Sequence, residues 1–197
     1  MKQYELKSGL FERSRKLNLT ENYIEFENGN LKGGEFTRLN KKDIADFKHG
    51  VDRIVWYKFT AGWQFSITFK STENEELKII FKNYFGGGSH YYETYLQIID
   101  VVGDYYHQGI VNKYLERFDS NEEIHLHGLR INRSGIQLNE NKTFLNWEHV
   151  NVKWYYRYFA IFHKDDARIH ARISHNEYET ETLYGVINAI LKGLWEE

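Results

Sequence analysis

The chain has 197 residues, which is enough for one large domain or two small ones with a core that needs no covalent staples. It contains no cysteine, which excludes disulfides, thiolate metal sites and thiol redox catalysis and favours a reducing compartment. The formal net charge is −2, and basic and acidic residues are nearly balanced both before and after residue 120, so the charge pattern of a nucleic-acid-binding protein is missing. We find no leader peptide and no apolar run long enough to span a membrane, and we therefore expect a cytoplasmic protein.

The first part of the chain predicts short antiparallel strands. Residues 16–26 alternate polar and apolar side chains around a Thr-Glu-Asn turn, which indicates a hairpin. Trp63, Phe65, Ile67 and Phe69 alternate with polar residues without a break, so this stretch predicts a strand with one buried face. Further strands are predicted at residues 35–39, 44–47, 53–59 and 77–81.

Two amphipathic helices are predicted, each after a run of strands. Between residues 91 and 118, apolar side chains recur at i, i+3, i+4 and i+7, and we expect a kink or a restart at Gly109. The same spacing recurs between residues 183 and 194. The segment 94–100 of the first helix aligns with the segment 182–188 of the second.

The strand pattern also recurs in the second part of the chain. Residues 129–138 align with residues 17–26, because each stretch has two alternating segments around a turn. Residues 145–150 align with residues 39–44, after a tip that has lost several residues. The sequence therefore predicts an α+β protein made of two copies of one building unit. We expect residues 1–119 to form the first domain and residues 120–197 a shorter second one.

The order of elements in each copy resembles the pleckstrin-homology-like (PH-like) fold of bacterial tandem proteins. In that superfamily, a bent antiparallel sheet or open barrel is closed by one C-terminal amphipathic helix. Residues 144–152 in the second copy, Phe-Leu-Asn-Trp-Glu-His-Val-Asn-Val, resemble the third strand and following polar corner of bacterial members. The resemblance implies two tandem PH-like units and a binding role, whereas fold alone implies no activity.

The resemblance also implies where a lipid headgroup would bind. Phosphoinositide-binding members hold the headgroup with several Lys and Arg residues in the first hairpin loop. Here the corresponding tip, residues 27–35, offers Lys32 between two glutamates, and the tip of the second copy offers Lys142. The chain departs from the pattern of the lipid-binding members, so we do not expect a headgroup site.

Motifs for metal binding and catalysis are weak. His125 and His127 are predicted on one strand face, and His149, His163 and His170 complete the set of candidate ligands. No carboxylate stands at ligand spacing from the His125–His127 pair, so we expect neither a metal nor a cofactor.

Catalytic and phosphate-binding motifs are no stronger. The pairs at residues 122–123 and 165–166 fall in predicted turns, where acidic side chains are usually solvated, and no Gly-x-Ser-x-Gly elbow occurs. Gly86, Gly87 and Gly88 lack the Lys-Ser/Thr of a phosphate-binding loop and are interpreted as a flexible connection. We therefore predict a non-enzymatic protein without catalytic residues.

The strand segment at residues 150–163 predicts the candidate binding surface. Its even-numbered positions are mostly apolar and are expected to face the core. The opposite face is mixed, and we name five candidate binding residues on it: Lys153, Tyr155, Arg157, Phe159 and Ile161. Two interpretations stay open, namely packing against the first copy and binding of a partner. The same two interpretations apply to Val55-Trp56-Tyr57-Lys58-Phe59 in the first copy.

From the sequence we expect an intracellular binding module whose partner is a protein, with no nucleic acid bound and with the oligomeric state left open. The first alternative is a peripheral protein of anionic membranes, with contacts from the basic residues Lys2, Lys7, Arg13, Arg15 and Lys16. The second alternative is a small-ligand-binding or hydrolytic protein with a pocket between sheet and helix.

Overall fold

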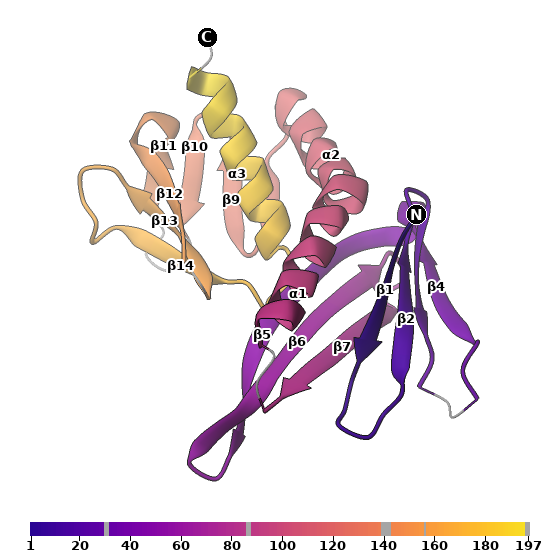
Figure 1. Cartoon of the computed structure of the whole chain (residues 1–197). Helices are drawn as coiled ribbons and strands as arrows, with labels where there is room; N and C mark the ends of the chain where they lie inside the picture. The colour runs from indigo at the N-terminus through magenta and orange to yellow at the C-terminus, as the bar shows by residue number, and fades with distance from the viewer. Residues whose placement is uncertain (30–31, 86–87, 139–142, 156, 196–197) are drawn as a thin grey trace. The chain divides into compact units, whose positions relative to one another are not determined.

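The computed structural model describes residues 1–29, 32–85, 88–138, 143–155 and 157–195. It confirms the prediction of an α+β protein with antiparallel sheets (Figure 1). The chain divides into two compact units, Met1–His107 and Gln108–Glu197. Among the described residues, none of the helices is both long and apolar enough to cross a membrane.

Unit 1 contains two antiparallel sheets followed by a helix. The first sheet has the order β1-β2-β3-β4, with strands at Lys2–Lys7, Ser14–Leu19, Tyr23–Glu27 and Phe36–Asn40. The second has the order β5-β6-β7, with strands at Ile44–Trp56, Phe59–Ser71 and Glu76–Tyr84. A 3-10 turn, η1 (Lys41–Asp43), joins the two sheets, and α1 (Gly88–Val102) follows them.

The core of unit 1 takes side chains from both sheets and from α1. The predicted alternation on β6 is confirmed for Phe65, Ile67 and Phe69, which are completely or almost completely buried, whereas Trp63 on the same face is half-buried. Helix α1 buries Tyr95 and Ile98, and the Tyr95 ring packs 5.4 Å from that of Phe65. The side chains that recur every two residues on the strand and about every 3.6 residues on the helix therefore pack together in one apolar layer.

The end of the first helical segment is irregular. A π-helical turn, η2 (Gly103–His107), follows α1, so the irregularity lies before Gly109, at which the sequence predicted it. Tyr106 is buried on this turn, and its hydroxyl lies 2.7 Å from the carbonyl oxygen of Thr20 and 2.8 Å from that of Tyr23. The hydroxyl donates its single hydrogen to this pair of carbonyls, and it ties the helix end to the β2–β3 turn.

Unit 2 begins with a helix and then repeats the order of elements in unit 1. Helix α2 (Gln108–Asp119) is followed by the sheet β11-β10-β9-β8, with strands in chain order at Ile124–Leu126, Leu129–Asn132, Gly135–Leu138 and Thr143–Asn146. The 3-10 turn η3 (Trp147–His149) leads to the sheet β12-β13-β14, with strands at Val150–Trp154, Tyr158–His163 and His170–Ser174. Helix α3 (Thr180–Trp195) ends the unit.

The core of unit 2 explains where the boundary between the units lies. Leu183, Val186 and Ile187 of α3 are fully buried, and Val111 and Phe118 of α2 belong to the same apolar cluster. The structure therefore assigns residues 108–119 to unit 2, whereas the sequence analysis placed them in the first domain. Helical periodicity finds the buried face of a helix but does not say which sheet covers it.

Within each unit, a 3-10 turn of the same form joins the four-stranded sheet to the three-stranded sheet. Turn η1 is flanked by Asn40 and Ile44, and turn η3 by Asn146 and Val150. In both turns the backbone N–H of the C-terminal flanking residue donates to the first carbonyl of the turn. The sequence alignment pairs residues 39–44 with residues 145–150, so the residues that flank the two turns correspond one to one.

Some sequence predictions fall on residues outside the described ranges. They concern Gly86 and Gly87 before the first helix, Lys142 at the tip of the second copy, and Tyr156 on the predicted apolar strand face.

Candidate functional site

The predicted binding face at residues 150–163 is divided between two sides of the sheet. Strand β12 pairs with β13 so that Val152 lies opposite Ile161 and Trp154 opposite Phe159. Even-numbered residues of β12 therefore share a side with odd-numbered residues of β13. The prediction carried one alternation through both strands, and it is corrected for Phe159 and Ile161, which are fully buried in the core of unit 2.

The other three predicted residues stay at the surface. Lys153 is exposed on the opposite side of the sheet, and its ammonium lies 5.4 Å from the centre of the Tyr155 ring. Arg157 is also exposed, and its carbonyl oxygen accepts the backbone N–H of His175 at 3.2 Å. The ring Nε2–H of His175 donates to the Tyr155 carbonyl oxygen at 3.0 Å. Tyr155 and Arg157 are therefore both hydrogen-bonded to the buried His175, and Lys153 lies beside the Tyr155 ring.

The basic residues near the N-terminus are partly engaged by an internal carboxylate. Glu27 on β3 is buried, and it pairs with Arg13 at 3.1 Å, while its carbonyl oxygen accepts Nε–H of Arg15 at 2.7 Å. Backbone N–H groups of Gly34 and Lys16 bind its carboxylate and lower the pKa of Glu27 to about 2, against the opposing effect of burial. Two of the basic residues proposed for membrane contact are thus structural partners of Glu27.

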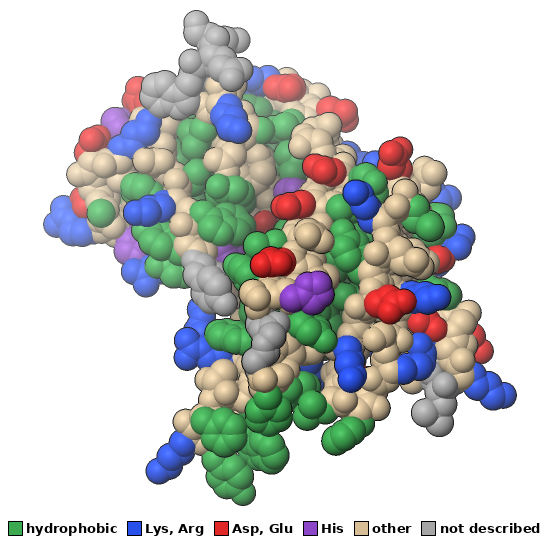
Figure 2. Space-filling model, in the orientation of Figure 1, with side chains coloured by type: hydrophobic (Ala, Val, Ile, Leu, Met, Phe, Trp, Pro, Cys, Tyr) green, Lys and Arg blue, Asp and Glu red, His purple; other side chains and the backbone are tan. Residues whose placement is uncertain are grey.

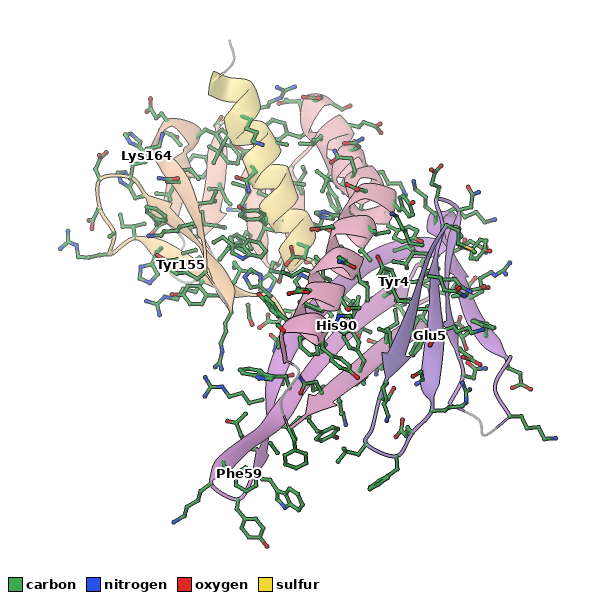
Figure 3. The ribbon with its side chains drawn as sticks, in the orientation of Figure 1. Tyr4, Glu5, Phe59, His90, Tyr155 and Lys164 are labelled. Carbon is green, nitrogen blue, oxygen red and sulfur yellow. The ribbon has the colours of Figure 1, made fainter. Side chains whose placement is uncertain are left out.

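A group of exposed apolar side chains lies at the far end of the β5–β6 hairpin. We call Val55, Trp56, Tyr57 and Phe59 the aromatic tip, and these side chains are 62%, 56%, 91% and 53% exposed. Figure 2 shows hydrophobic side chains gathered at this end of the hairpin, and Figure 3 labels Phe59 among them. Phe85, which follows β7, is also exposed, and its backbone N–H donates to the carbonyl of Ala61 at this end of the sheet.

The turn that forms the tip has an unusual residue. Trp56 and Phe59 are paired, so Tyr57 and Lys58 form a two-residue hairpin turn. Tyr57 has a φ of 55°, in the left-handed region that turns of this kind usually fill with Asn or Gly. A bulky L-residue there costs about 1–2 kcal/mol. Because Tyr57 is almost fully exposed, packing within unit 1 does not offset this cost.

The tip is built as a small preformed cluster on a ribbon. The Trp56 and Phe59 rings lie 6.3 Å apart, with 39° between their planes. A register shift between Ile54 and Val55 marks a bulge just before the tip, and bulges re-aim the side chains that follow them. In the described part of the chain, β5 is an edge strand of its sheet, and edge strands are the places where a segment of another chain can add to a sheet.

The candidate histidine ligands lie in different places. His125 contacts Glu123 at 2.9 Å, while His127 lies outside the strand in a left-handed turn and contacts Glu177 at 2.9 Å. His149 and His163 do come together, since their rings stack at 4.8 Å. The imidazole pair predicted at residues 125 and 127 is therefore separated, and a pair at residues 149 and 163 takes its place.

The aromatic tip presents large apolar and aromatic surface with the exposed Lys58 next to it in sequence. Trp and Tyr are two of the residue types enriched among those that dominate binding energy where two proteins meet. Isolated apolar side chains are normal on a surface, but four adjacent ones at the end of a ribbon form a patch. No protein-family model, no curated protein and no solved structure matches this chain.

Proposed function

We propose that the chain is a non-enzymatic binding protein made of two PH-like units, and that unit 1 contacts a protein partner through the aromatic tip. The observation that carries the proposal is Tyr57, which is 91% exposed in a backbone conformation unfavourable for a tyrosine. Local strain at an exposed residue is typical of positions selected for contact with something else.

The order of elements supports the PH-like part of the proposal. Each unit has a four-stranded antiparallel sheet, then a three-stranded antiparallel sheet, then a C-terminal helix whose apolar face is buried. This is the order that the resemblance implies for a bent sheet closed by one helix. Binding at a loop or strand edge is consistent with a fold of this kind, in which the sheets form a rigid support.

The charges near the tip favour a protein over an anionic membrane. Asp52 lies among the nearby basic residues Arg53 and Lys58, so the hairpin carries no strongly basic patch. Membrane attachment by one short apolar segment usually needs such a patch as a second signal. A protein partner needs only a pocket for the aromatic anchors and a segment that can pair with the edge of β5.

The test is affinity capture of the partner from a lysate of the cells in which the protein occurs. The bait pair is wild type and the triple variant Trp56→Ser/Tyr57→Ser/Phe59→Ser. The matched control is Leu10→Ser/Phe11→Ser, which removes two exposed apolar side chains from a different loop of unit 1. We expect a protein retained by wild type and by the control and lost by the triple variant, with equal thermal stability of all three. Retention by the triple variant would refute the role of the tip.

A membrane surface is the second candidate, and one observation favours it. Phe11 and Leu10 are exposed in the β1–β2 loop, so unit 1 presents a second apolar loop besides the tip. Co-sedimentation with vesicles of phosphatidylcholine and phosphatidylserine separates the two candidates. We expect the protein to stay in the supernatant at any fraction of phosphatidylserine. Sedimentation that both the triple variant and the Leu10→Ser/Phe11→Ser variant reduce would favour the membrane.

A further inference from the structure

A cluster of metal-ligating side chains lies in unit 2, separate from the aromatic tip. It consists of His149, His163 and Asp165, which each offer one ligand atom, and these atoms all lie within 4.8 Å of one another. His149 Nδ1 and an Asp165 carboxylate oxygen are 3.7 Å apart. In a tetrahedral site with bonds of about 2.05 Å, neighbouring ligand atoms are about 3.4 Å apart. Shifts of about 1 Å in partly exposed side chains would close the cluster around an ion.

The backbone brings these residues together. Val150 pairs with His163 across β12 and β13, and the N–H of Lys164 donates to the His149 carbonyl oxygen at 2.8 Å. The 3-10 turn that ends at His149 and the turn that contains Asp165 therefore meet at one end of the sheet. Figure 3 shows Lys164 at this end and Tyr155 toward the other, so the cluster is separate from the β12–β13 connection.

A carboxylate lies beside one of the imidazoles. Nε2 of His149 lies 3.3 Å from a Glu148 carboxylate oxygen, while Nδ1 of the same ring faces Asp165. Histidine ligands commonly donate their second ring N–H to a carboxylate, which fixes the tautomer and makes the ligating nitrogen more basic. Glu148 is placed to do this for His149, with Nδ1 as the ligand atom.

The other imidazole is engaged by the backbone. Nδ1 of His163 accepts the backbone N–H of Asp165 at 3.1 Å, so this nitrogen carries no proton, and a metal ion bound there would replace this hydrogen bond. The two rings are nearly parallel, with 11° between their planes, and a bound metal lies in the plane of each imidazole that it contacts. Metal binding would therefore turn at least one ring and break the stack, which provides a structural signature for the test.

The surrounding charges fit a cation. Asp166 is bound by Arg168 through two hydrogen bonds of 2.8 and 2.9 Å, whereas the Asp165 carboxylate faces the imidazoles. The Lys164 ammonium is held on the Glu148 carbonyl oxygen at 2.8 Å. With the Asp166–Arg168 pair neutral, Glu148 and Asp165 outweigh Lys164 around the two histidines.

We propose that His149, His163 and Asp165 form a binding site for a divalent transition-metal ion, with Glu148 as the residue that positions His149. Two imidazole nitrogens and one carboxylate oxygen suit Zn²⁺ and its first-row neighbours better than Ca²⁺ or Mg²⁺, which prefer oxygen ligands. Three protein ligands leave at least one coordination position open to water or to a partner's side chain. This site does not depend on the proposed function of unit 1.

The first test is calorimetric titration of the full chain with Zn²⁺ alone, in a buffer that does not chelate metals. We expect one Zn²⁺ per chain, and we expect Asp165→Asn and His163→Gln each to weaken the affinity at least about tenfold. His125→Gln is the matched control, because it removes a surface histidine outside the cluster, and it should leave the affinity unchanged. Absence of saturable one-to-one binding, or equal affinity in all variants, would overturn the site.

The second test uses the wild-type chain alone, so its result does not depend on the stability of any variant. Histidine side-chain NMR spectra of the wild-type chain should change on addition of Zn²⁺ at the His149 and His163 rings, as the stack opens. The rings of His125 and His127 should not change. Zn²⁺-dependent changes at those two rings, with none at His149 and His163, would assign the metal elsewhere and contradict the proposal.

Discussion

Tyr57 stands at a turn position where the hairpin needs a left-handed backbone but not a tyrosine. Its left-handed φ is one that asparagine and glycine adopt at little cost in a two-residue hairpin turn. We therefore expect Tyr57→Asn to raise the free energy of unfolding of the chain by about 0.5–1 kcal/mol, because it relieves the strain and removes no buried contact. Urea denaturation of both proteins measures this difference. A loss of stability would show that Tyr57 packs within unit 1.

Glu27 is a residue at which the pH dependence of stability can be predicted. Its pKa is about 2 in the folded protein, held down by the N–H groups of Gly34 and Lys16, against 4.5 as the ordinary value. Its stabilising contribution is therefore complete above about pH 4.5 and is lost as the pH falls toward 2.

The change that tests this is Glu27→Gln. The variant should be less stable than wild type at pH 7, and its stability should fall less steeply between pH 4.5 and 2. Urea denaturation over this pH range gives both results. Asp166, whose pKa is also about 2, leaves a residual slope in both proteins. Identical slopes in the variant and wild type would contradict the assignment to Glu27.

The β12–β13 hairpin shows why strand faces are hard to predict across a turn. In β12 and β13 the alternation was carried through the connection, although the pairing reverses which residues face inward. The number of residues between the two strands decides whether even- or odd-numbered residues of β13 face the core. The apolar pattern does not indicate which, because both faces of this hairpin contain aromatic residues. Trp154 and Phe159 therefore share a side, whereas the sequence analysis separated them.

This correction predicts different effects for neighbouring residues. Phe159 is fully buried, so Phe159→Ala should destabilise unit 2 by about 3–5 kcal/mol. Tyr155 is partly exposed and stacks on Tyr158, so Tyr155→Ala should cost about 1 kcal/mol or less. Thermal and chemical denaturation of the two variants checks the order. Similar losses in both would mean that the assigned register of β12 and β13 is wrong.

The outer part of the β5–β6 hairpin could be predicted only in pieces. The sequence analysis expected separate strands at residues 44–47 and 53–59, whereas β5 runs unbroken from Ile44 to Trp56. Its middle and outer residues are half-buried or exposed, so the two-residue alternation that a single buried face imposes is missing there. The sequence analysis named residues 55–59 as a stretch that could either pack or bind a partner. These residues are exposed because β5 and β6 are each 13 residues long, and the sequence did not predict that length.

At the scale of the whole chain, the sequence predicted the α+β class and the antiparallel sheets, because alternation and helical periodicity are both strong. The alignment of residues 39–44 with 145–150 was also informative, since both stretches contain the same 3-10 turn in the structure. The cluster of His149, His163 and Asp165 could be predicted only in part. His149 and His163 were candidates and Asp165 is close to His163 in sequence, but the pairing of Val150 with His163 is what brings His149 to them, and no sequence spacing reveals it.

The position of the boundary between units leads to a prediction about fragments. Residues 108–197 include Val111 and Phe118, which belong to the core of unit 2, so this fragment should unfold cooperatively. The fragment 120–197 lacks both side chains and should be mostly unfolded, because their loss approaches the whole stability of a unit of this size, about 5–10 kcal/mol. Circular dichroism during thermal unfolding compares the two. Equal stability would place the boundary after residue 119.

The central claim is that unit 1 binds a protein partner through the aromatic tip, and one comparison tests it most directly. Wild type and Tyr57→Asn are used as baits for affinity capture, with Phe11→Asn as the control for loss of an exposed aromatic ring. Because Tyr57→Asn is expected to stabilise the fold, unfolding cannot explain a loss of binding. We predict that the partner is lost with Tyr57→Asn and retained with wild type and Phe11→Asn. Full retention by Tyr57→Asn would contradict the proposed function of the tip.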